Sequence, residues 1–172
     1  AYEHLPKWMQ QGVVVWNKGN IELENGSKIL AAATSSSAVR GSSFNIIFLD
    51  EFAHVPNNIA DQFFTSVYPT ISSGETTKVF IVSTPLGLNM FYKLWVDAEE
   101  GRNNYTPIEV AWKEVPGRDD KWKTETIKNT SQQQFTQEFE CEFIGSTLTL
   151  IAPSKLKTMT FQNPIASRGG LD

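Results

Sequence analysis

The stretch FNIIFLDE, residues 44–51, decides the fold. Its apolar run, residues 46–49, contains no polar residue. Such a run predicts a strand buried on both faces, as in parallel sheets that are covered by helices. The run ends in two adjacent acids, Asp50 and Glu51, which stand at the carboxyl end of the predicted strand. In open α/β sheets, ligands bind beyond that end of the strands.

A second stretch of the same kind, KVFIVSTP at residues 78–85, follows downstream. It predicts another strand buried on both faces, which Pro85 stops. Residues 60–68, between the two strands, predict a helix, and residues 89–100 predict another that ends at Gly101. Strand, helix, strand and helix in this order predict an open α/β sheet with right-handed crossovers.

The upstream segment carries a hairpin signal. Residues 13–16 are a short run rich in β-branched side chains. Asn25 and Gly26 then separate an alternating run, residues 21–24, from a second run at residues 27–33. An Asn-Gly pair between two such runs is the strongest short-range signal for a β-hairpin.

The downstream segment has a looser pattern. Residues 105–112 predict one more strand, and residues 119–128 and 132–141 predict two short helices. Ser131 is a suitable N-cap for the second of these helices. This part of the chain therefore predicts a small helical subdomain.

The amino-acid composition argues against several classes of protein. The net charge is −4, which argues against a chain coated in DNA-binding basic surface. Cys141 is the single cysteine, so neither an internal disulfide framework nor a thiolate zinc site is expected. We find no membrane-spanning apolar run and no signal peptide, and a soluble, reducing compartment fits best. Both ends of the sequence resemble cuts in a longer protein.

The paired acids suit phosphoryl transfer. Successive strand side chains point to opposite faces, so two adjacent carboxylates can take two tasks. Asp50 can hold a magnesium ion through a water, while Glu51 orients and deprotonates an attacking water. The alternative is a strand that simply runs into a solvated acidic loop.

Three more residues are candidates beside this acid pair. The hydroxyls of Ser83 and Thr84, at the exit of the second strand, would face the same crevice and could sense a terminal phosphate. Arg40 could stabilise transition-state charge, in its own site or in a neighbouring one. Each of these residues also has a purely structural interpretation, because hydroxyls often cap turns and arginines often lie at the surface. His54 is more simply a packed or capping histidine.

Several segments in the same order resemble the large terminase subunit of tailed bacteriophages, especially the T4-like ones. The resemblance extends from residue 1 to about residue 143, over three-quarters of the chain. The segments that carry it are YEHLP (2–6), WNKG (16–19), IELENGS (21–27), AVRGSSF (38–44), the acid pair at 50–51 and TPLGLNMFY (84–92).

The resemblance implies roles for the candidate residues. Residues 47–50 resemble a Walker B strand, with Asp50 serving magnesium and Glu51 as the catalytic carboxylate. Residues 82–84 resemble the motif that couples hydrolysis to DNA movement, although Val82 departs from the threonine-rich pattern of T4-like relatives. Arg40 lies where ring-forming members place an arginine that reaches a neighbouring subunit's nucleotide.

The resemblance also implies a domain plan. Residues 1–104 would be a partial ATPase core with a parallel sheet of the P-loop NTPase (ASCE) type, flanked by helices. Residues 105–152 would be a small linking subdomain, and residues 153–172 an exit segment towards a nuclease domain. The implied cofactors are ATP and magnesium. The implied partners are double-stranded DNA, the portal and procapsid, the small terminase subunit and further copies in a ring, with no membrane, in the host cytoplasm at the assembling procapsid.

One expected motif does not occur in the sequence. No G-x-x-x-x-G-K-[ST] phosphate loop is present in these 172 residues. We therefore expect the parent protein to be an ATPase, and this chain alone to bind ATP weakly and to hydrolyse it poorly. Two alternatives stay open: a helicase-like nucleic-acid translocase, and a non-catalytic scaffold module derived from a motor.

Overall fold

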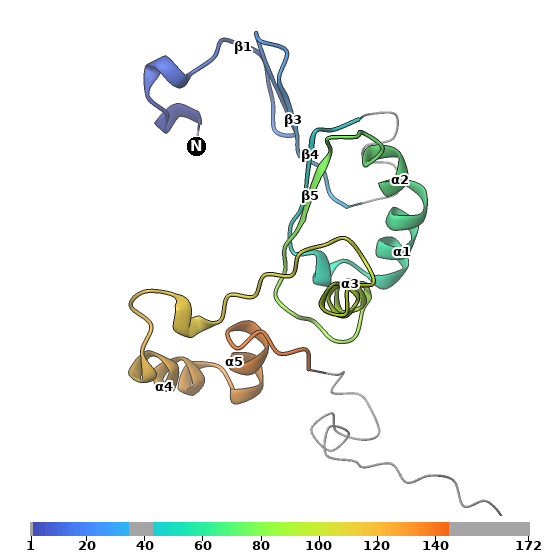
Figure 1. Ribbon diagram of the computed structural model, residues 1–172. Coiled ribbons are helices and arrows are strands. Elements are labelled where there is room, and N and C mark those ends of the chain that lie inside the picture. Colours follow the sequence, from blue (N-terminus) through green and yellow to red (C-terminus); the bar gives the residue numbers. More distant parts are fainter. Residues whose placement is uncertain (1, 35–42, 145–172) are drawn as a thin grey trace, which may run out of the picture. The chain divides into compact units, whose positions relative to one another are not determined.

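The computed structural model describes residues 2–34 and 43–144 (Figure 1). The chain divides into two compact units. The first comprises residues 1–49 and 55–81, and the second comprises residues 50–54 and 82–172. The predicted boundaries at residues 104 and 152 stay a prediction, and Arg40 lies outside the described residues.

The predicted hairpin is confirmed in the first unit. After two short 3-10 helices, Tyr2–His4 and Lys7–Met9, the strands β1 (Val13–Trp16), β2 (Asn20–Leu23) and β3 (Lys28–Leu30) form an antiparallel sheet in the order β1-β2-β3. The turn between β2 and β3 contains Gly26 with a φ of 81°, a conformation that glycine adopts without a side-chain clash. The local Asn-Gly signal therefore located this turn correctly.

The first unit also contains a parallel pair of strands. β4 (Ile46–Leu49) and β5 (Lys78–Ile81) run side by side, with Leu49 opposite Ile81. The connection between them contains a 3-10 helix, Phe52–His54, and the helices α1 (Asn57–Ser66) and α2 (Tyr68–Ile71). The prediction of a mixed α/β protein with parallel strands and helices is confirmed at this level, and the parallel sheet has two strands within residues 2–34 and 43–144.

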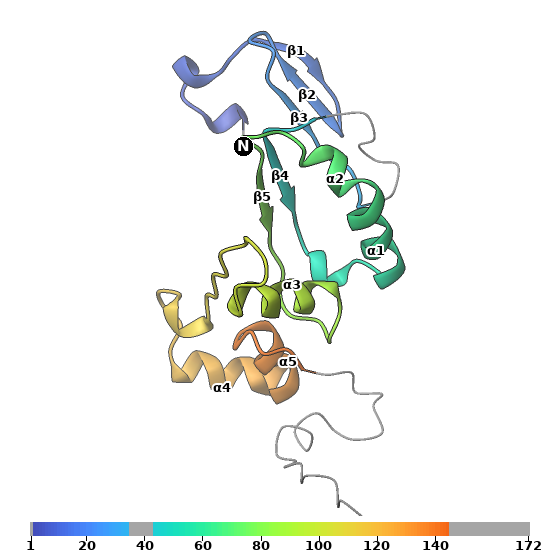
Figure 2. The ribbon, with the colours of Figure 1, turned by 45° about the vertical axis from the view of Figure 1, so that its right-hand side comes forward.

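The prediction that both strands are buried on both faces was wrong. In β4, Ile47 and Leu49 are buried, whereas Ile46 and Phe48 are 64% and 60% exposed. The rings of Phe48 and Phe80 pair on the exposed face, with centroids 6.4 Å apart. Within this unit, α1 and α2 lie along one side of the β4–β5 pair in both views (Figures 1 and 2), so the described residues cover one face only.

The second unit begins its helical part with α3 (Met90–Glu99). Gly101 follows with a φ of 68°, which confirms the predicted end of this helix. The strand predicted at residues 105–112 was wrong, because residues 105–111 belong to no strand and Trp112 begins a 3-10 helix. The backbone groups of this segment form hydrogen bonds other than those of a β-sheet. The amide of Tyr105 donates to the side chain of Asn103, and the amide of Trp112 donates to the carbonyl of Phe139.

An aromatic cluster holds the two predicted short helices together. α4 (Asp120–Asn129) and α5 (Gln132–Glu138) are confirmed, and Ser131 caps α5 as predicted by accepting from the amide of Gln134 at 3.0 Å. Phe135 and Trp112, the latter in the 3-10 helix Trp112–Glu114, are buried at the centre of the cluster. The other rings are those of Trp122 and Phe139, and all neighbouring centroids in the cluster lie 5.2–5.9 Å apart.

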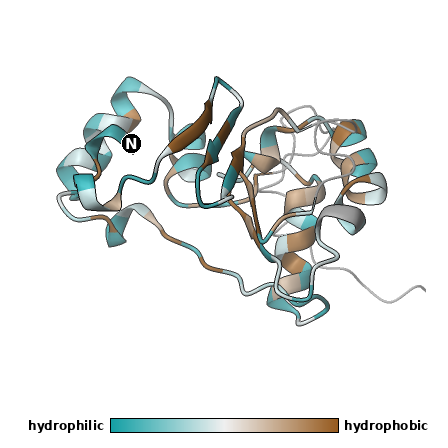
Figure 3. Cartoon of the chain, turned by 90° about the horizontal axis from the view of Figure 1, so that it is seen from above, coloured by the Kyte–Doolittle hydropathy of each residue, from teal (hydrophilic) through white to brown (hydrophobic). Residues whose placement is uncertain are grey.

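The hydropathy of the residues differs between the strands and the helices. Figure 3 shows strands that are largely hydrophobic and helices whose turns alternate between hydrophilic and hydrophobic residues. Among the helices of the described ranges, none combines the length and the apolar character that a membrane span requires.

Candidate functional site

The acid pair lies at a sharp change of backbone direction. Directly after β4, Glu51 adopts a φ of 51°, in the left-handed region that few residues other than glycine occupy. The Asp50 carboxylate accepts a hydrogen bond from the Glu51 amide at 3.1 Å. A left-handed non-glycine residue costs on the order of 1–3 kcal/mol and tends to occur at functional sites. Glu51, the second acid of the pair, therefore has a strained backbone conformation.

A single 3-10 turn follows and brings a histidine beside the second acid. The His54 amide donates to the Glu51 carbonyl at 2.9 Å, which is the i to i+3 bond of such a turn. Side chains three residues apart eclipse one another in this geometry. The Nε2 atom of His54 consequently lies 3.4 Å from Oε2 of Glu51.

The β5 exit, residues 82–84 directly after the strand, is hydrogen-bonded to this turn. The amide of Phe52 donates to the carbonyl of Val82 at 3.2 Å, and the amide of Ala53 donates to Oγ of Ser83 at 3.0 Å. At the next residue of the turn, Nε2 of His54 lies 3.3 Å from Oγ1 of Thr84. Three consecutive residues of one exit are thus matched to three consecutive residues of the other.

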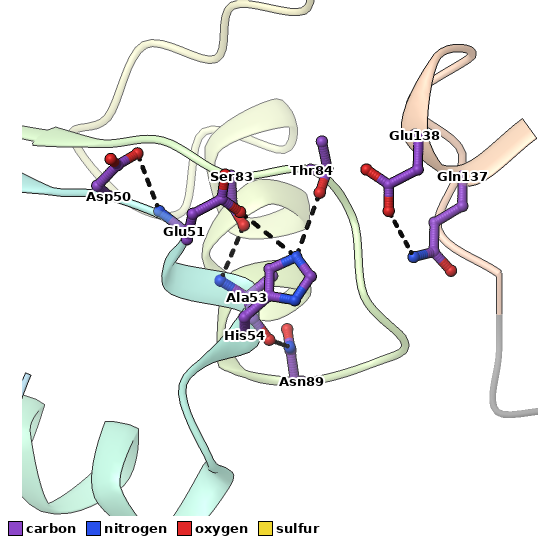
Figure 4. A network of polar contacts seen from close by, with 9 residues as sticks. All are labelled: Asp50, Glu51, Ala53, His54, Ser83, Thr84, Asn89, Gln137 and Glu138. Carbon is purple, nitrogen blue, oxygen red and sulfur yellow. Dashed lines mark hydrogen bonds and ion pairs between the residues drawn. The ribbon is translucent and has the colours of Figure 1, made fainter. Parts of the chain in front are cut away.

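Asn89 adds a fourth attachment. Its Nδ2 donates to the carbonyl of Ala53 at 2.7 Å, while its Oδ1 accepts from the amide of Tyr92 at 3.2 Å and caps α3. One side chain therefore fixes the turn after the acid pair and the start of the helix at the same time. Figure 4 shows this network, with Asp50 and Glu51 on one side of His54 and Ser83, Thr84 and Asn89 around it.

A cavity of about 320 Å³ opens beside these residues within the second unit. Glu51, Ser83 and Thr84 supply part of its polar lining, together with two further acids, Glu109 and Glu138. The remaining wall is mainly apolar and includes Val82, Pro85, Phe91, Trp95, Ile108, Val110, Cys141 and Phe143. The acid and the two hydroxyls predicted for the site therefore border one shared space.

Cys141 has the features of a structural rather than a reactive cysteine. Burial raises the pKa of its thiol, and the nearby carboxylates of Glu109, Glu114 and Glu138 raise that pKa further. The thiol is therefore protonated at neutral pH, where only the thiolate would be nucleophilic. Its Sγ donates to the carbonyl of Val110 at 3.5 Å, and both residues line the cavity.

The structure brings four of the five predicted site residues together. Asp50, Glu51, Ser83 and Thr84 lie at the two bonded strand exits, whereas Arg40 lies outside the described residues. Their roles stay predictions. Ser83 uses its oxygen to accept from the backbone, so its own hydroxyl proton is the part that can still donate to a ligand.

Sequence reasoning missed the contributions of Asn89 and His54. Asn89 was predicted as the first residue of a helix at residues 89–100, whereas it is the N-cap of α3, a position that asparagine favours and that could have drawn attention to it. His54 lies three residues after Glu51, a spacing that is informative only when the intervening residues form a 3-10 turn. The contact of His54 with Thr84, thirty residues away, has no local signal.

The acid pair fits a magnesium ion held mainly by water and phosphate. Magnesium prefers oxygen ligands, keeps several waters and often uses only one or two carboxylates besides substrate phosphates. Asp50 is exposed and offers a carboxylate at the strand exit. Within residues 2–34 and 43–144, no three His, Cys, Asp or Glu side chains gather as a cage of protein ligands. A single Asp50 carboxylate is consistent with the water-mediated mode.

The fold and the site together define a mixed α/β protein whose two parallel strand exits carry an acid pair and a pair of hydroxyls. A family model described as terminase large subunit, T4-like virus type, N-terminal, matches residues 4–158, and the chain belongs to this family. The predicted resemblance to the large terminase subunit of bacteriophages is thereby confirmed. Membership gives the chain a role related to the DNA-packaging motor, in a family that generally combines ATPase and nuclease activities and acts with DNA and the packaging complex.

Proposed function

We propose that this chain supplies the water-activating half of the ATPase site in a terminase motor. In this proposal, ATP hydrolysis drives double-stranded DNA into a procapsid. The observation that carries it is the bonding of the Asp50–Glu51 exit to the Ser83–Thr84 exit, within one unit and beside one cavity. Hydrolysis requires this juxtaposition, because the group that positions water must lie close to the groups that meet the terminal phosphate. The P-loop NTPase type of sheet is part of the same proposal.

The residues divide the chemistry as follows. Asp50 would hold magnesium, which when bound neutralises charge on the phosphates. Glu51 orients the attacking water and takes its proton on Oε1, since Oε2 already faces His54. Ser83 donates its hydroxyl proton to a phosphate oxygen while its oxygen keeps accepting from Ala53.

The wider assembly belongs to this proposal too. A motor of this kind acts at the portal of a procapsid in the host cytoplasm, with the small terminase subunit and with further copies of itself in a ring. Arg40 is the residue we assign to reach the nucleotide of a neighbouring copy.

The test compares magnesium-dependent ATP hydrolysis by the full-length protein that contains this chain with that of its Glu51→Gln variant. Glu51→Gln keeps the size of the side chain but removes the proton acceptor. We expect hydrolysis to fall about a hundredfold or more, as is usual for loss of a general base. Glu125→Gln, the same change at an exposed position of α4, is the matched control and should leave hydrolysis unchanged. Equal rates for wild type and Glu51→Gln would refute the proposal and favour a non-catalytic scaffold.

A further inference from the structure

One ring nitrogen of His54 has two partners from different strand exits. Nε2 lies 3.4 Å from the Glu51 carboxylate and 3.3 Å from the Thr84 hydroxyl. Figure 4 shows both contacts meeting at the same atom. Both distances exceed the roughly 2.9–3.0 Å of a well-formed N–H···O hydrogen bond, so neither partner holds the nitrogen at full strength.

The chemistry of imidazole allows Nε2 only one of two bonds at full strength. If Nε2 carries a proton, it can donate that proton to the Glu51 carboxylate or to Oγ1 of Thr84, but one N–H group serves only one of these acceptors well. A bond to one partner therefore weakens the bond to the other. The position of Thr84, at the β5 exit, can therefore change how strongly His54 binds the carboxylate of Glu51.

We propose that His54 is a positioning residue that ties the orientation of the Glu51 carboxylate to the Thr84 hydroxyl. This inference rests on the function proposed above, in which Glu51 activates water. His54 holds Oε2 of Glu51 and leaves Oε1 for the water. When the residues that follow β5 move, Nε2 shifts towards Thr84 and releases the carboxylate. The rate of hydrolysis then depends on the position of these residues.

A purely structural role does not account for these contacts. The turn that carries His54 is already held by backbone bonds and by the side chains of Ser83 and Asn89. The side chains of His54 and Glu51 are 42% and 64% exposed, and exposed pairs of this kind contribute little to stability. Removing the imidazole should therefore leave the fold intact and change the chemistry.

The experiment measures steady-state ATP hydrolysis by the full-length protein and four variants. His54→Phe keeps a flat ring without the nitrogen, and His54→Gln places an amide nitrogen near the position of Nε2. Glu51→Gln and the double variant Glu51→Gln/His54→Phe complete the set. Thermal melting of each variant checks that the protein folds, and we expect His54→Phe to melt within about 2 °C of wild type.

The expected pattern separates positioning from structure. His54→Phe should lower kcat about tenfold to a hundredfold with little change in KM for ATP, because a misplaced catalytic group costs rate and not binding. His54→Gln should recover most of that loss, because its amide can donate to the carboxylate. In the Glu51→Gln background, His54→Phe should cause no further loss, because a residue that acts through Glu51 has nothing left to position.

Each other result counts against the inference. If Glu51→Gln lowers hydrolysis but His54→Phe does not, His54 has no positioning role and the proposed function stands. If the losses of the two variants multiply in the double variant, or if His54→Gln fails to recover activity, His54 acts independently of Glu51. If Glu51→Gln itself has no effect, the proposed function fails and the positioning role fails with it.

Discussion

Replacing Asn89 by alanine should loosen the candidate site by an amount that the structure allows us to work out. The variant loses the cap on α3, a change that costs about 1 kcal/mol at typical N-caps. It also removes the donor to the carbonyl of Ala53, a residue that is 2% exposed, and an unsatisfied buried acceptor costs about 1–3 kcal/mol. The two terms together predict a local destabilisation of about 2–4 kcal/mol.

Hydrogen exchange followed by mass spectrometry is the suitable assay, because it reports local opening. Peptides over residues 50–56 and 89–100 should lose protection by roughly 30- to 1,000-fold, since 1.4 kcal/mol corresponds to a factor of ten. Asn89→Asp is the matched variant: it keeps an acceptor for the Tyr92 amide but has no donor for Ala53. It should expose residues 50–56 while largely sparing the start of α3. A change in protection below about threefold for Asn89→Ala would refute the view that this side chain fastens the turn to the helix.

Two further predictions concern the helical part of the second unit. Phe135→Ala should destabilise the protein by about 3–5 kcal/mol, because it removes a fully buried ring from the aromatic cluster, and urea denaturation of wild type and variant measures the difference. The hydrogen bond from Lys123 lowers the pKa of Glu140 below its ordinary value of 4.5, so its stabilisation is complete above that pH and is lost as the pH falls through the lowered pKa. Glu140→Gln should therefore cost about 1 kcal/mol at pH 7, and its melting curve should converge with that of wild type as the pH falls below 4.5; a constant gap at all pH values would contradict this.

Local patterns predicted most elements of the fold. Asn25 and Gly26 located the first hairpin, Gly101 located the end of α3, and Ser131 located the start of α5. These signals succeed because each depends on a backbone conformation or a capping bond within a few residues. The same holds for the acid pair, which an apolar run places at a strand end.

Burial and strand pairing were less accessible to sequence patterns. The uninterrupted apolar run at residues 46–49 predicted two covered faces, yet Ile46 and Phe48 are exposed because the helices of this unit lie along one face. Residues 105–112 have the composition of a strand, but their backbone groups bond to side chains and to the end of α5. A strand requires a partner, and no pattern within the segment says whether one is present.

The sequence by itself determined most of the elements, the acid pair and the hydroxyl pair, because these follow from residue types at fixed local spacing, and it determined the family through a resemblance of several segments in the same order. Only the tertiary structure decided that His54 lies between Glu51 and Thr84, that Ser83 accepts from the backbone of Ala53, and that Asn89 joins this turn to α3. Apart from the pair His54 and Glu51, those contacts join residues thirty or more positions apart, and they follow from the parallel pairing of β4 and β5 with Leu49 opposite Ile81. That register sets both strand exits at the same end of the sheet, where short polar side chains can bond across the gap.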